Sequence, residues 1–221
     1  MKYKNLLFDL DGTLTDSREG ITNSIQYALD KLGGPKEEKE TLLKYIGPPL
    51  SETFKDYFDD LETQKKAVLT YRERYEDYGW KENRVYEGVH EMLKALKDAG
   101  YKIFMGTSKP KKYAGYIADY FEFSQYFDEI FGASLDGKIN TKEQVLAYAL
   151  DHIYSGSYDE QENKDVLMIG DRFYDVCGAA EFGIPTLGVS YGFGSEEELR
   201  ANGALDVVDS PKAVVDWLGN C

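Results

Sequence analysis

The sequence predicts an α/β fold, a doubly wound parallel sheet with a helical segment inserted near its N-terminus. Leu6-Leu7-Phe8 is a continuous apolar run, which suits a strand buried on both faces. From Val85 onward, short apolar runs alternate with apolar residues at helical spacing, and this alternation implies right-handed crossovers between parallel strands. Between about residue 16 and residue 83 no convincing strand occurs, so we expect a helical insertion there.

The inserted segment combines helix-spaced apolar residues with turns that break helices. Its first helix ends at Gly33-Gly34-Pro35 and is indicated by Ile21, Ile25, Ala28, Leu29 and Leu32. Gly47-Pro48-Pro49-Leu50 is a second break, because prolines are excluded from helix interiors. Two further helices are indicated by apolar groups, the first by Phe54, Tyr57 and Phe58 and the second by Ala67, Val68, Tyr71, Tyr75 and Tyr78.

The rest of the chain alternates between strands and helices. The predicted strands cover residues 102–107, 130–133, 166–170, 185–189 and 206–208. Amphipathic helices are predicted around residues 89–96, 113–117, 145–153 and 214–218. Ligands of such sheets bind at the carboxyl ends of the strands, so functional residues are expected at those ends.

Composition excludes several classes of partner. The formal net charge is −14 and the sequence pI is about 4.6, which argues against a nucleic-acid polymer or an anionic membrane as partner. No stretch approaches the roughly 18 apolar residues of a membrane helix. Cys177 and Cys221 form neither a metal pattern nor a disulfide framework, so we expect a protein of the reduced cytoplasm. We further expect a monomer or a homodimer.

The first strand ends in two carboxylates, a glycine and two hydroxyls, Asp9-Leu10-Asp11-Gly12-Thr13-Leu14-Thr15. At roughly 3.3 Å rise per residue, positions i and i+2 of a strand lie about 6 to 7 Å apart on one face, with room for one ion or phosphoryl group. A hard cation such as Mg²⁺ relieves the repulsion between two such carboxylates. Gly12 allows a tight turn that brings its amide close to an anion. The alternative is an Asp-Gly turn followed by Thr15, Asp16 or Ser17 as a helix N-cap.

Three later strand ends carry candidate site residues. Thr107-Ser108 precedes a predicted helix, where a hydroxyl and free amides suit a phosphate oxygen, although Thr or Ser there also serves as a plain N-cap. Asp171 and Asp175 follow the strand at 166–170, and they could face a metal or simply favour a helix N-terminus. Lys142 begins the helix after the strand at 130–133, but Lys138 cannot be distinguished from it by sequence.

In their order and spacing, these motifs together resemble the haloacid dehalogenase-like hydrolases. Phe8-Asp9-Leu10-Asp11-Gly12-Thr13-Leu14 is similar to the family's most specific signature, and Tyr45-Ile46-Gly47-Pro48-Pro49-Leu50 with Thr107-Ser108-Lys109-Pro110 resembles its phosphoglycolate phosphatase and bacterial 5'-nucleotidase-like branch. The resemblance implies a Rossmann-like catalytic core, residues 1–15 and 84–221, and a helical cap domain, residues 16–83.

The resemblance also implies a role for each residue. Asp9 would be the nucleophile, Asp11 the general acid and base, and Lys142 the cation that neutralises the phosphoryl oxygens. Mg²⁺ would be held by Asp9, Asp171 and the Asp11 carbonyl, with Asp175 supporting the metal or the lysine. The substrate would be bound by a last set of residues, Gly12, Thr107, Ser108, Pro48 and Leu50.

The expected function is Mg²⁺-dependent hydrolysis of small phosphate monoesters, of the phosphoglycolate or nucleotide type, through an aspartyl-phosphate. A phosphotransferase such as a β-phosphoglucomutase-like sugar-phosphate mutase is the alternative within the same architecture. A non-catalytic module that binds Mg²⁺ or phosphate is the alternative of another class, and Asp11 and the long insertion argue against it.

Overall fold

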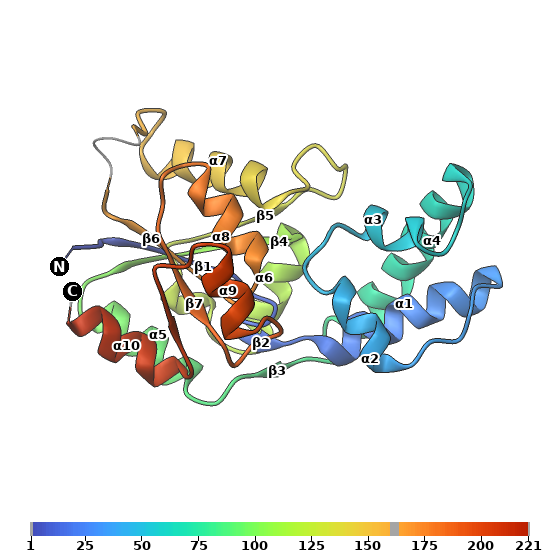
Figure 1. Cartoon of the computed structure of the whole chain (residues 1–221), viewed down its shortest axis with the longest axis horizontal. Coiled ribbons are helices and arrows are strands. Elements are labelled where there is room, and N and C mark those ends of the chain that lie inside the picture. The colour runs from blue at the N-terminus through green and yellow to red at the C-terminus, as the bar shows by residue number, and fades with distance from the viewer. Residues whose placement is uncertain (1, 160–163, 221) are drawn as a thin grey trace. The chain divides into compact units, whose positions relative to one another are not determined.

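The computed structural model describes residues 2–159 and 164–220 (Figure 1). The chain divides into two compact units. One consists of Met1–Thr15 with Val85–Cys221, and the other of Asp16–Arg84. Two short strands, β2 (Thr15–Asp16) and β3 (Arg84–Val85), pair where the chain passes from one unit to the other.

The first unit contains a six-stranded sheet of order β5-β4-β1-β6-β7-β8, in which every pair of neighbours is parallel. The predicted doubly wound parallel sheet is therefore confirmed. β1 is one of the two central strands and is flanked by β4 and β6, so the first motif lies in the middle of the sheet. The strands are β1 (Asn5–Phe8), β4 (Lys102–Pro110), β5 (Glu129–Ala133), β6 (Val166–Gly170), β7 (Thr186–Val189) and β8 (Asp206–Val208).

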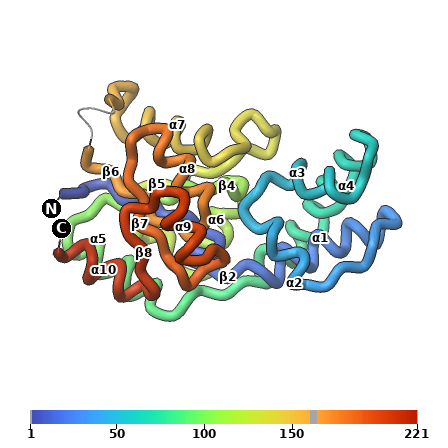
Figure 2. Tube along the Cα trace, in the orientation of Figure 1, coloured from blue at the N-terminus to red at the C-terminus, as the bar shows by residue number. Residues whose placement is uncertain are grey.

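Helices cover both faces of this sheet. Figure 1 shows α7 (Lys142–Ile153) and α8 (Phe173–Ala180) on one side and α5 (Val89–Asp98) and α10 (Pro211–Gly219) on the other. The remaining helices of this unit are α6 (Lys111–Tyr120), the 3-10 turn η3 (Ser124–Tyr126) and α9 (Glu196–Ala201). Tyr3 stacks on Trp217 of α10 with ring centroids 6.2 Å apart, so the two ends of the described chain lie side by side (Figure 2).

The core explains why the strand ends are rigidly placed. On the side of α7 and α8, Leu7 and Met168 pack with Val145, Leu146 and other buried residues in one apolar cluster. Burying each such side chain stabilises the fold by about 1.5 to 3 kcal/mol. Because this packing fixes β1 and β6 side by side, with Phe8 opposite Ile169, the residues that follow both strands leave the sheet at the same edge.

The second unit is helical, as predicted. Its elements are α1 (Arg18–Leu32), α2 (Lys39–Leu42), the 3-10 turn η1 (Leu43–Tyr45), α3 (Leu50–Lys55), α4 (Leu61–Arg74) and the π-helical turn η2 (Tyr75–Gly79). Gly20 of α1 passes so close to η2 that a Cβ there would lie 1.9 Å from the Gly79 carbonyl oxygen. Arg74 pairs with Glu82 at 2.7 Å, which ties the end of α4 to the chain that leaves the unit.

Two helices of this unit differ from the prediction. Tyr57 and Phe58 were expected on the helix of Phe54, but α3 ends at Lys55, and both residues lie in the turn that follows, where their amides donate to the Phe54 carbonyl oxygen at 3.3 and 3.1 Å. Tyr75 and Tyr78 were expected on one helix with Tyr71, but the regular helix α4 ends at Arg74 and both residues belong to η2.

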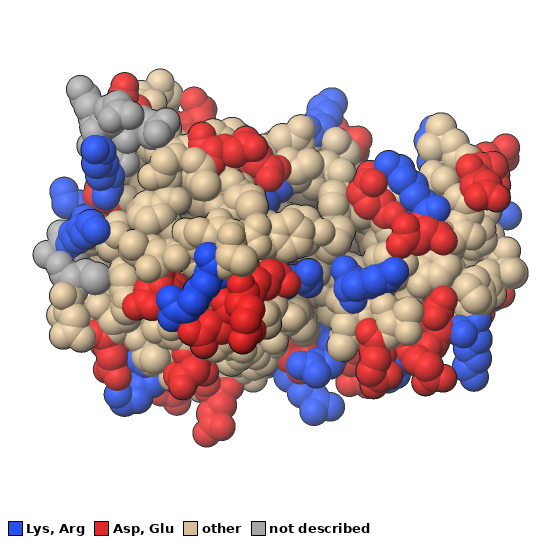
Figure 3. Space-filling view, in the orientation of Figure 1, with Lys and Arg blue, Asp and Glu red and all other residues tan. Residues whose placement is uncertain are grey.

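The charge of the chain shows at the surface. Figure 3 shows many acidic side chains on one face, with a group of them over α9, where Glu196, Glu197 and Glu198 occupy the first turn. Such a surface repels anions, so an anionic ligand must be attracted by local positive charge. Within the described ranges, no helix has the combined length and apolar character needed to cross a lipid bilayer.

Candidate active site

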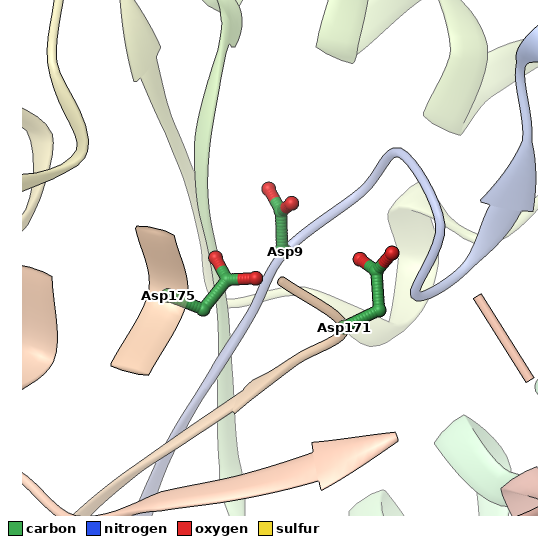
Figure 4. Close-up of side chains that lie close together, drawn as sticks. All are labelled: Asp9, Asp171 and Asp175. Atoms are coloured by element: carbon green, nitrogen blue, oxygen red, sulfur yellow. The ribbon is translucent and has the colours of Figure 1, made fainter. Parts of the chain in front are cut away.

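Three carboxylates meet at the carboxyl end of the central strands. Asp9 directly follows β1, Asp171 directly follows β6, and Asp175 lies in the first turn of α8 (Figure 4). One oxygen from each carboxylate lies within 4.8 Å of the others. The parallel pairing of β1 with β6 produces this arrangement, because strand ends that share an edge bring together residues far apart in sequence.

Burial makes two of these carboxylates, Asp171 and Asp175, costly to ionise. Asp171 and Asp175 are both 0% exposed. Burial raises the pKa of Asp171 well above its ordinary value, and the neighbouring Asp175 and Asp9 raise it further. Burial also raises the pKa of Asp175 to about 6; Asp9 adds to that rise, while Lys142 opposes it. Perturbed carboxyls in one place are typical of a functional site.

Lys142 is the cation at this cluster. Its Nζ lies 2.9 Å from Asp9 Oδ1 and 2.8 Å from Asp175 Oδ1, and it donates a hydrogen bond to the Gly106 carbonyl oxygen at 2.8 Å. Burial alone would lower the pKa of Lys142, but Asp175 and Asp9 outweigh burial and raise it. The lysine therefore stays charged, and it restrains the Asp9 carboxylate.

The donor set fits a divalent cation. Asp9, Asp171 and Asp175 supply three carboxylates, which Lys142 neutralises only in part. Hard oxygen donors around an excess of negative charge are what Mg²⁺ prefers. The side chain of Asp11 does not belong to this group of three, and a contribution of its backbone carbonyl to a metal stays a prediction.

Asp171 is held by residues that sequence reasoning missed. Thr13 Oγ1 donates to Asp171 Oδ1 at 3.1 Å, and the Phe193 amide donates to Asp171 Oδ2 at 2.8 Å. A Cβ on Gly192 would lie 2.4 Å from Asp171 Cβ and 2.3 Å from the Gly12 carbonyl oxygen. The loop after β7 therefore needs a glycine to reach Asp171; its sequence signal is Gly192-Phe193-Gly194 just after a strand.

Gly12 makes the predicted tight turn, with φ of 91°. Its amide donates to the Thr15 carbonyl oxygen at 2.8 Å within that turn. A Cβ at this position would lie 2.1 Å from Asp171 Oδ2, so the glycine also allows the first motif to approach the metal-ligand candidate.

Thr107 and Ser108 do not lie at a helix start, which corrects one prediction. The strand predicted over 102–107 continues to Pro110, with an irregular register between Thr107 and Pro110, and α6 begins only at Lys111. Thr107 is buried, and its Oγ1 accepts a hydrogen bond from the Lys109 amide at 3.2 Å. The strand is longer than predicted because its pairing with β5 resumes at Pro110 after the irregularity. Polar residues at 107–109 therefore do not mark the end of the strand.

Lys109 is the second buried lysine of the site; sequence reasoning included it in the motif Thr107-Ser108-Lys109-Pro110 but assigned it no role. Its Nζ lies 2.6 Å from Asp11 Oδ2, with side-chain exposures of 4% and 13%. The sequence does contain a signal for it. Lys109 stands two residues after Thr107, and alternate side chains of a strand point to the same face, so a strand extended past Thr107 would place both side chains on one face.

Pro48 and Leu50, the remaining predicted substrate-binding residues, belong to the helical unit. Pro48 precedes Pro49, the N-cap of α3, and Leu50 is the first residue of that helix. Both are partly exposed.

Comparison with known proteins identifies relatives over most of the chain. The family model described as haloacid dehalogenase-like hydrolase matches residues 6–189. A 5'-nucleotidase from Pseudomonas aeruginosa is 44% identical over 203 residues, which cover 91% of this chain and 89% of that protein. Tyrosine-protein kinase PtkA from Mycobacterium tuberculosis is 38% identical over 189 residues, covering 86% of this chain and 62% of that longer protein. A crystal structure from Clostridium acetobutylicum, described as a predicted phosphatase, has a TM-score of 0.92 and 42% identity, with 100% of both chains covered.

The family match extends over every residue of the carboxylate cluster and both buried lysines. The chain therefore belongs to the haloacid dehalogenase-like hydrolases and is an enzyme of their phosphoric monoester hydrolase kind.

Proposed function

We propose that this enzyme hydrolyses small phosphate monoesters with the help of Mg²⁺, through a phosphoryl group carried on Asp9. The observation that carries the proposal is the convergence of Asp9 with Lys142, Asp171 and Asp175 at one strand edge. A partly buried carboxylate next to a buried ammonium is placed to attack an electrophile that also bears negative charge.

In the first step of this proposal, an Asp9 oxygen forms a bond to phosphorus as the bond from phosphorus to the ester oxygen breaks. The leaving oxygen takes a proton from Asp11. In the second step, water attacks the phosphorus, Asp11 accepts the water proton, and the bond from Asp9 to phosphorus breaks. Proton transfer by a positioned carboxyl is typically worth about a hundredfold to ten-thousandfold in rate.

Charge neutralisation is the other requirement of phosphoryl transfer. Lys142 supplies one buried positive charge beside Asp9. Asp9, Asp171, Asp175 and the Asp11 carbonyl are the groups that would hold Mg²⁺, which would supply further positive charge for the phosphoryl oxygens. We assign the Thr107 hydroxyl and the neighbouring Ser108 to binding of the phosphoryl group. Gly12 is left out of this assignment, because its amide already donates to the Thr15 carbonyl oxygen.

For the substrate, the relative named 5'-nucleotidase supports a nucleoside monophosphate within the class of small monoesters. The relative named tyrosine-protein kinase gives some support to transfer of the phosphoryl group to an acceptor other than water. Hydrolysis and transfer differ only in what attacks the phosphoryl group on Asp9, so the same residues would serve both. We keep the cytoplasm as the proposed location.

The test uses 4-nitrophenyl phosphate first and then a panel of nucleoside 5'-monophosphates, phosphoglycolate and sugar phosphates. We expect turnover with Mg²⁺, none in excess chelator, recovery when Mg²⁺ is restored, and poor turnover with Ca²⁺, whose coordination is larger and looser. Inorganic phosphate released in equal amount to the alcohol indicates hydrolysis; a phosphorylated acceptor in its place indicates transfer. Full activity in excess chelator would contradict the proposed metal dependence.

A further inference from the structure

We propose that Lys109 is a positioning residue for Asp11: it holds one oxygen of that carboxylate and leaves the other for proton exchange with the leaving group. This inference rests on the proposed role of Asp11 as general acid and base. Nothing in the first motif or its neighbours indicates it, because Lys109 comes from β4, the strand next to β1.

The contact is short and shielded. Lys109 Nζ lies 2.6 Å from Asp11 Oδ2, and the lysine side chain is 4% exposed. Surface ion pairs bring little order, because both partners are solvated and mobile, whereas a pair this deeply buried has few alternative geometries. The Asp11 carboxylate is therefore held in one orientation.

The other oxygen of the same carboxylate, Asp11 Oδ1, has no such partner. It is shielded from solvent, and it accepts no hydrogen bond from any part of the chain that the structure describes. An ammonium group can only donate, so the oxygen that faces Lys109 cannot carry a proton toward it. Geometry thus leaves Oδ1 as the oxygen that carries the proton.

The two buried lysines then have separate tasks. Lys142 contacts Asp9 and Asp175, and Lys109 contacts Asp11. The first acts on the carboxylate that attacks phosphorus, and the second on the carboxylate that exchanges protons. Loss of Lys109 should therefore slow the first step most for esters whose leaving oxygen needs a proton, and least for esters whose leaving group departs readily without one.

The backbone supports this division. Thr107 Oγ1 accepts a hydrogen bond from the Lys109 amide at 3.2 Å, which fixes the main chain two residues before α6 begins. The register irregularity between Thr107 and Pro110 lies at the same place. The strand therefore carries Thr107 and Lys109 past the sheet edge on a fixed path, and both side chains are buried there.

The experiment compares two esters that differ in leaving group, 4-nitrophenyl phosphate with a good one and phenyl phosphate with a poor one. kcat/KM reports on the first step for each ester. For Lys109→Met we expect kcat/KM for phenyl phosphate to fall at least roughly tenfold further than kcat/KM for 4-nitrophenyl phosphate. This factor is smaller than the rate enhancement that a general acid as a whole provides, because Asp11 itself is still present. Lys109→Arg, which keeps the positive charge, should recover part of that difference.

A double-mutant comparison separates action through Asp11 from independent action. Asp11→Asn should show the same dependence on leaving group, and adding Lys109→Met to it should increase that dependence no further. Lys102→Met, an exposed lysine at the other end of β4, is the matched control and should behave as wild type. Thermal melting checks each fold, and Lys109→Gln replaces Lys109→Met if the latter does not fold.

Equal losses with both esters would overturn the inference, because they would assign Lys109 to binding the phosphoryl group or to the fold. A further leaving-group effect of Lys109→Met in the Asp11→Asn background would also overturn it. Absence of turnover by the wild-type enzyme with both esters is a different result, since it would contradict the proposed function itself.

Discussion

Asp9 is held by Lys142, whose Nζ lies 2.9 Å from Asp9 Oδ1 although Asp9 follows the first strand and Lys142 begins α7, far along the chain. The same ammonium lies 2.8 Å from Asp175 Oδ1. One buried cation is thus shared between two carboxylates of a group of three, and its removal should affect both stability and activity.

Lys142→Met should lower the free energy of unfolding by about 3 to 5 kcal/mol in chelator, because it leaves buried carboxylates without their partner. Activity should fall roughly a hundredfold or more, since the variant lacks the charge beside the phosphoryl group. Denaturant unfolding and steady-state kinetics measure the two effects.

The matched control for this variant is Lys138→Met. Lys138 pairs with Asp136 at 3.0 Å, and its side chain is 84% exposed, so neither stability nor turnover should change measurably. Similar effects of the two substitutions would show that the buried contacts of Lys142 have no special importance.

A second prediction concerns the loop that contacts Asp171. Gly192→Ala places a methyl group where a Cβ would lie 2.4 Å from Asp171 Cβ, so the carboxylate or the loop must move. We expect the Mg²⁺ concentration for half-maximal activity to rise roughly tenfold or more, as for other groups that orient metal ligands. The increase in melting temperature on adding Mg²⁺ should shrink as well, and this readout does not depend on turnover.

Gly115→Ala is the control for that substitution. A Cβ at Gly115, inside α6, meets nothing within 4 Å, so alanine should leave Mg²⁺ activation unchanged and stabilise the helix by up to about 1 kcal/mol. Unchanged Mg²⁺ activation in Gly192→Ala would mean that Asp171 does not bind the metal or that the loop does not position it.

The pH dependence of stability follows from the raised pKa of Asp175, about 6 against an ordinary 3.8. A carboxyl that binds its proton more tightly when folded adds stability below about pH 3.8 and loses that contribution as the pH rises through about 6. In chelator, the free energy of unfolding of wild type relative to Asp175→Asn should therefore fall between about pH 4 and pH 7. The raised pKa of Asp171 acts in the same direction.

Asp136→Asn is a suitable reference for this measurement. Hydrogen bonds from the Ser134 hydroxyl and Lys138 lower the pKa of Asp136 to about 2, so that carboxyl is ionised in both folded and unfolded chains above about pH 5. The difference in free energy of unfolding between wild type and Asp136→Asn should therefore stay constant above about pH 5. A flat or rising difference for Asp175→Asn over the same range would contradict the electrostatic account of the cluster.

Two strands were predicted residue for residue, 166–170 as β6 and 206–208 as β8. β6 is apolar and buried along its whole length, so its apolar run ends where the strand ends. The approach of Asp9 to Asp171 could be expected for a related reason: in a parallel sheet, consecutive carboxyl ends share one edge.

Other features depend on packing that no local pattern shows. Lys138 and Lys142 look alike in sequence, and only the structure shows one exposed and the other buried. Lys109 was assigned no role because the strand was expected to end at Thr107, where the polar residues begin. The contact of Phe193 with Asp171 depends on how a loop folds back after β7, which composition does not determine.

A further prediction concerns Gly47-Pro48-Pro49-Leu50 in the helical unit, which we propose reads the leaving group of the substrate. The core motifs can bind only the phosphoryl group that all substrates share, so discrimination must come from other residues. Replacing Pro48 and Leu50 with alanine should change the ranking of natural phosphate esters far more than the rate with acetyl phosphate, whose leaving group is small.

Pro35→Ala, in an exposed loop of the same unit, controls for general loosening of that unit and should leave the ranking unchanged. The measurement is kcat/KM across the panel of esters. An equal proportional loss for every ester would assign the segment to the fold and not to substrate recognition.

The central claim is that Asp9 carries the phosphoryl group. Asp9→Asn keeps nearly the same shape but replaces the nucleophile with an amide, so the variant should stay folded and lose turnover. The most direct measurement mixes the enzyme with a ³²P-labelled ester and Mg²⁺, stops the reaction with acid within one turnover, and locates the label by proteolysis and mass spectrometry. We predict label on the peptide that contains Asp9 in wild type and none in Asp9→Asn; wild-type turnover by folded Asp9→Asn, or label on another residue, would contradict the account.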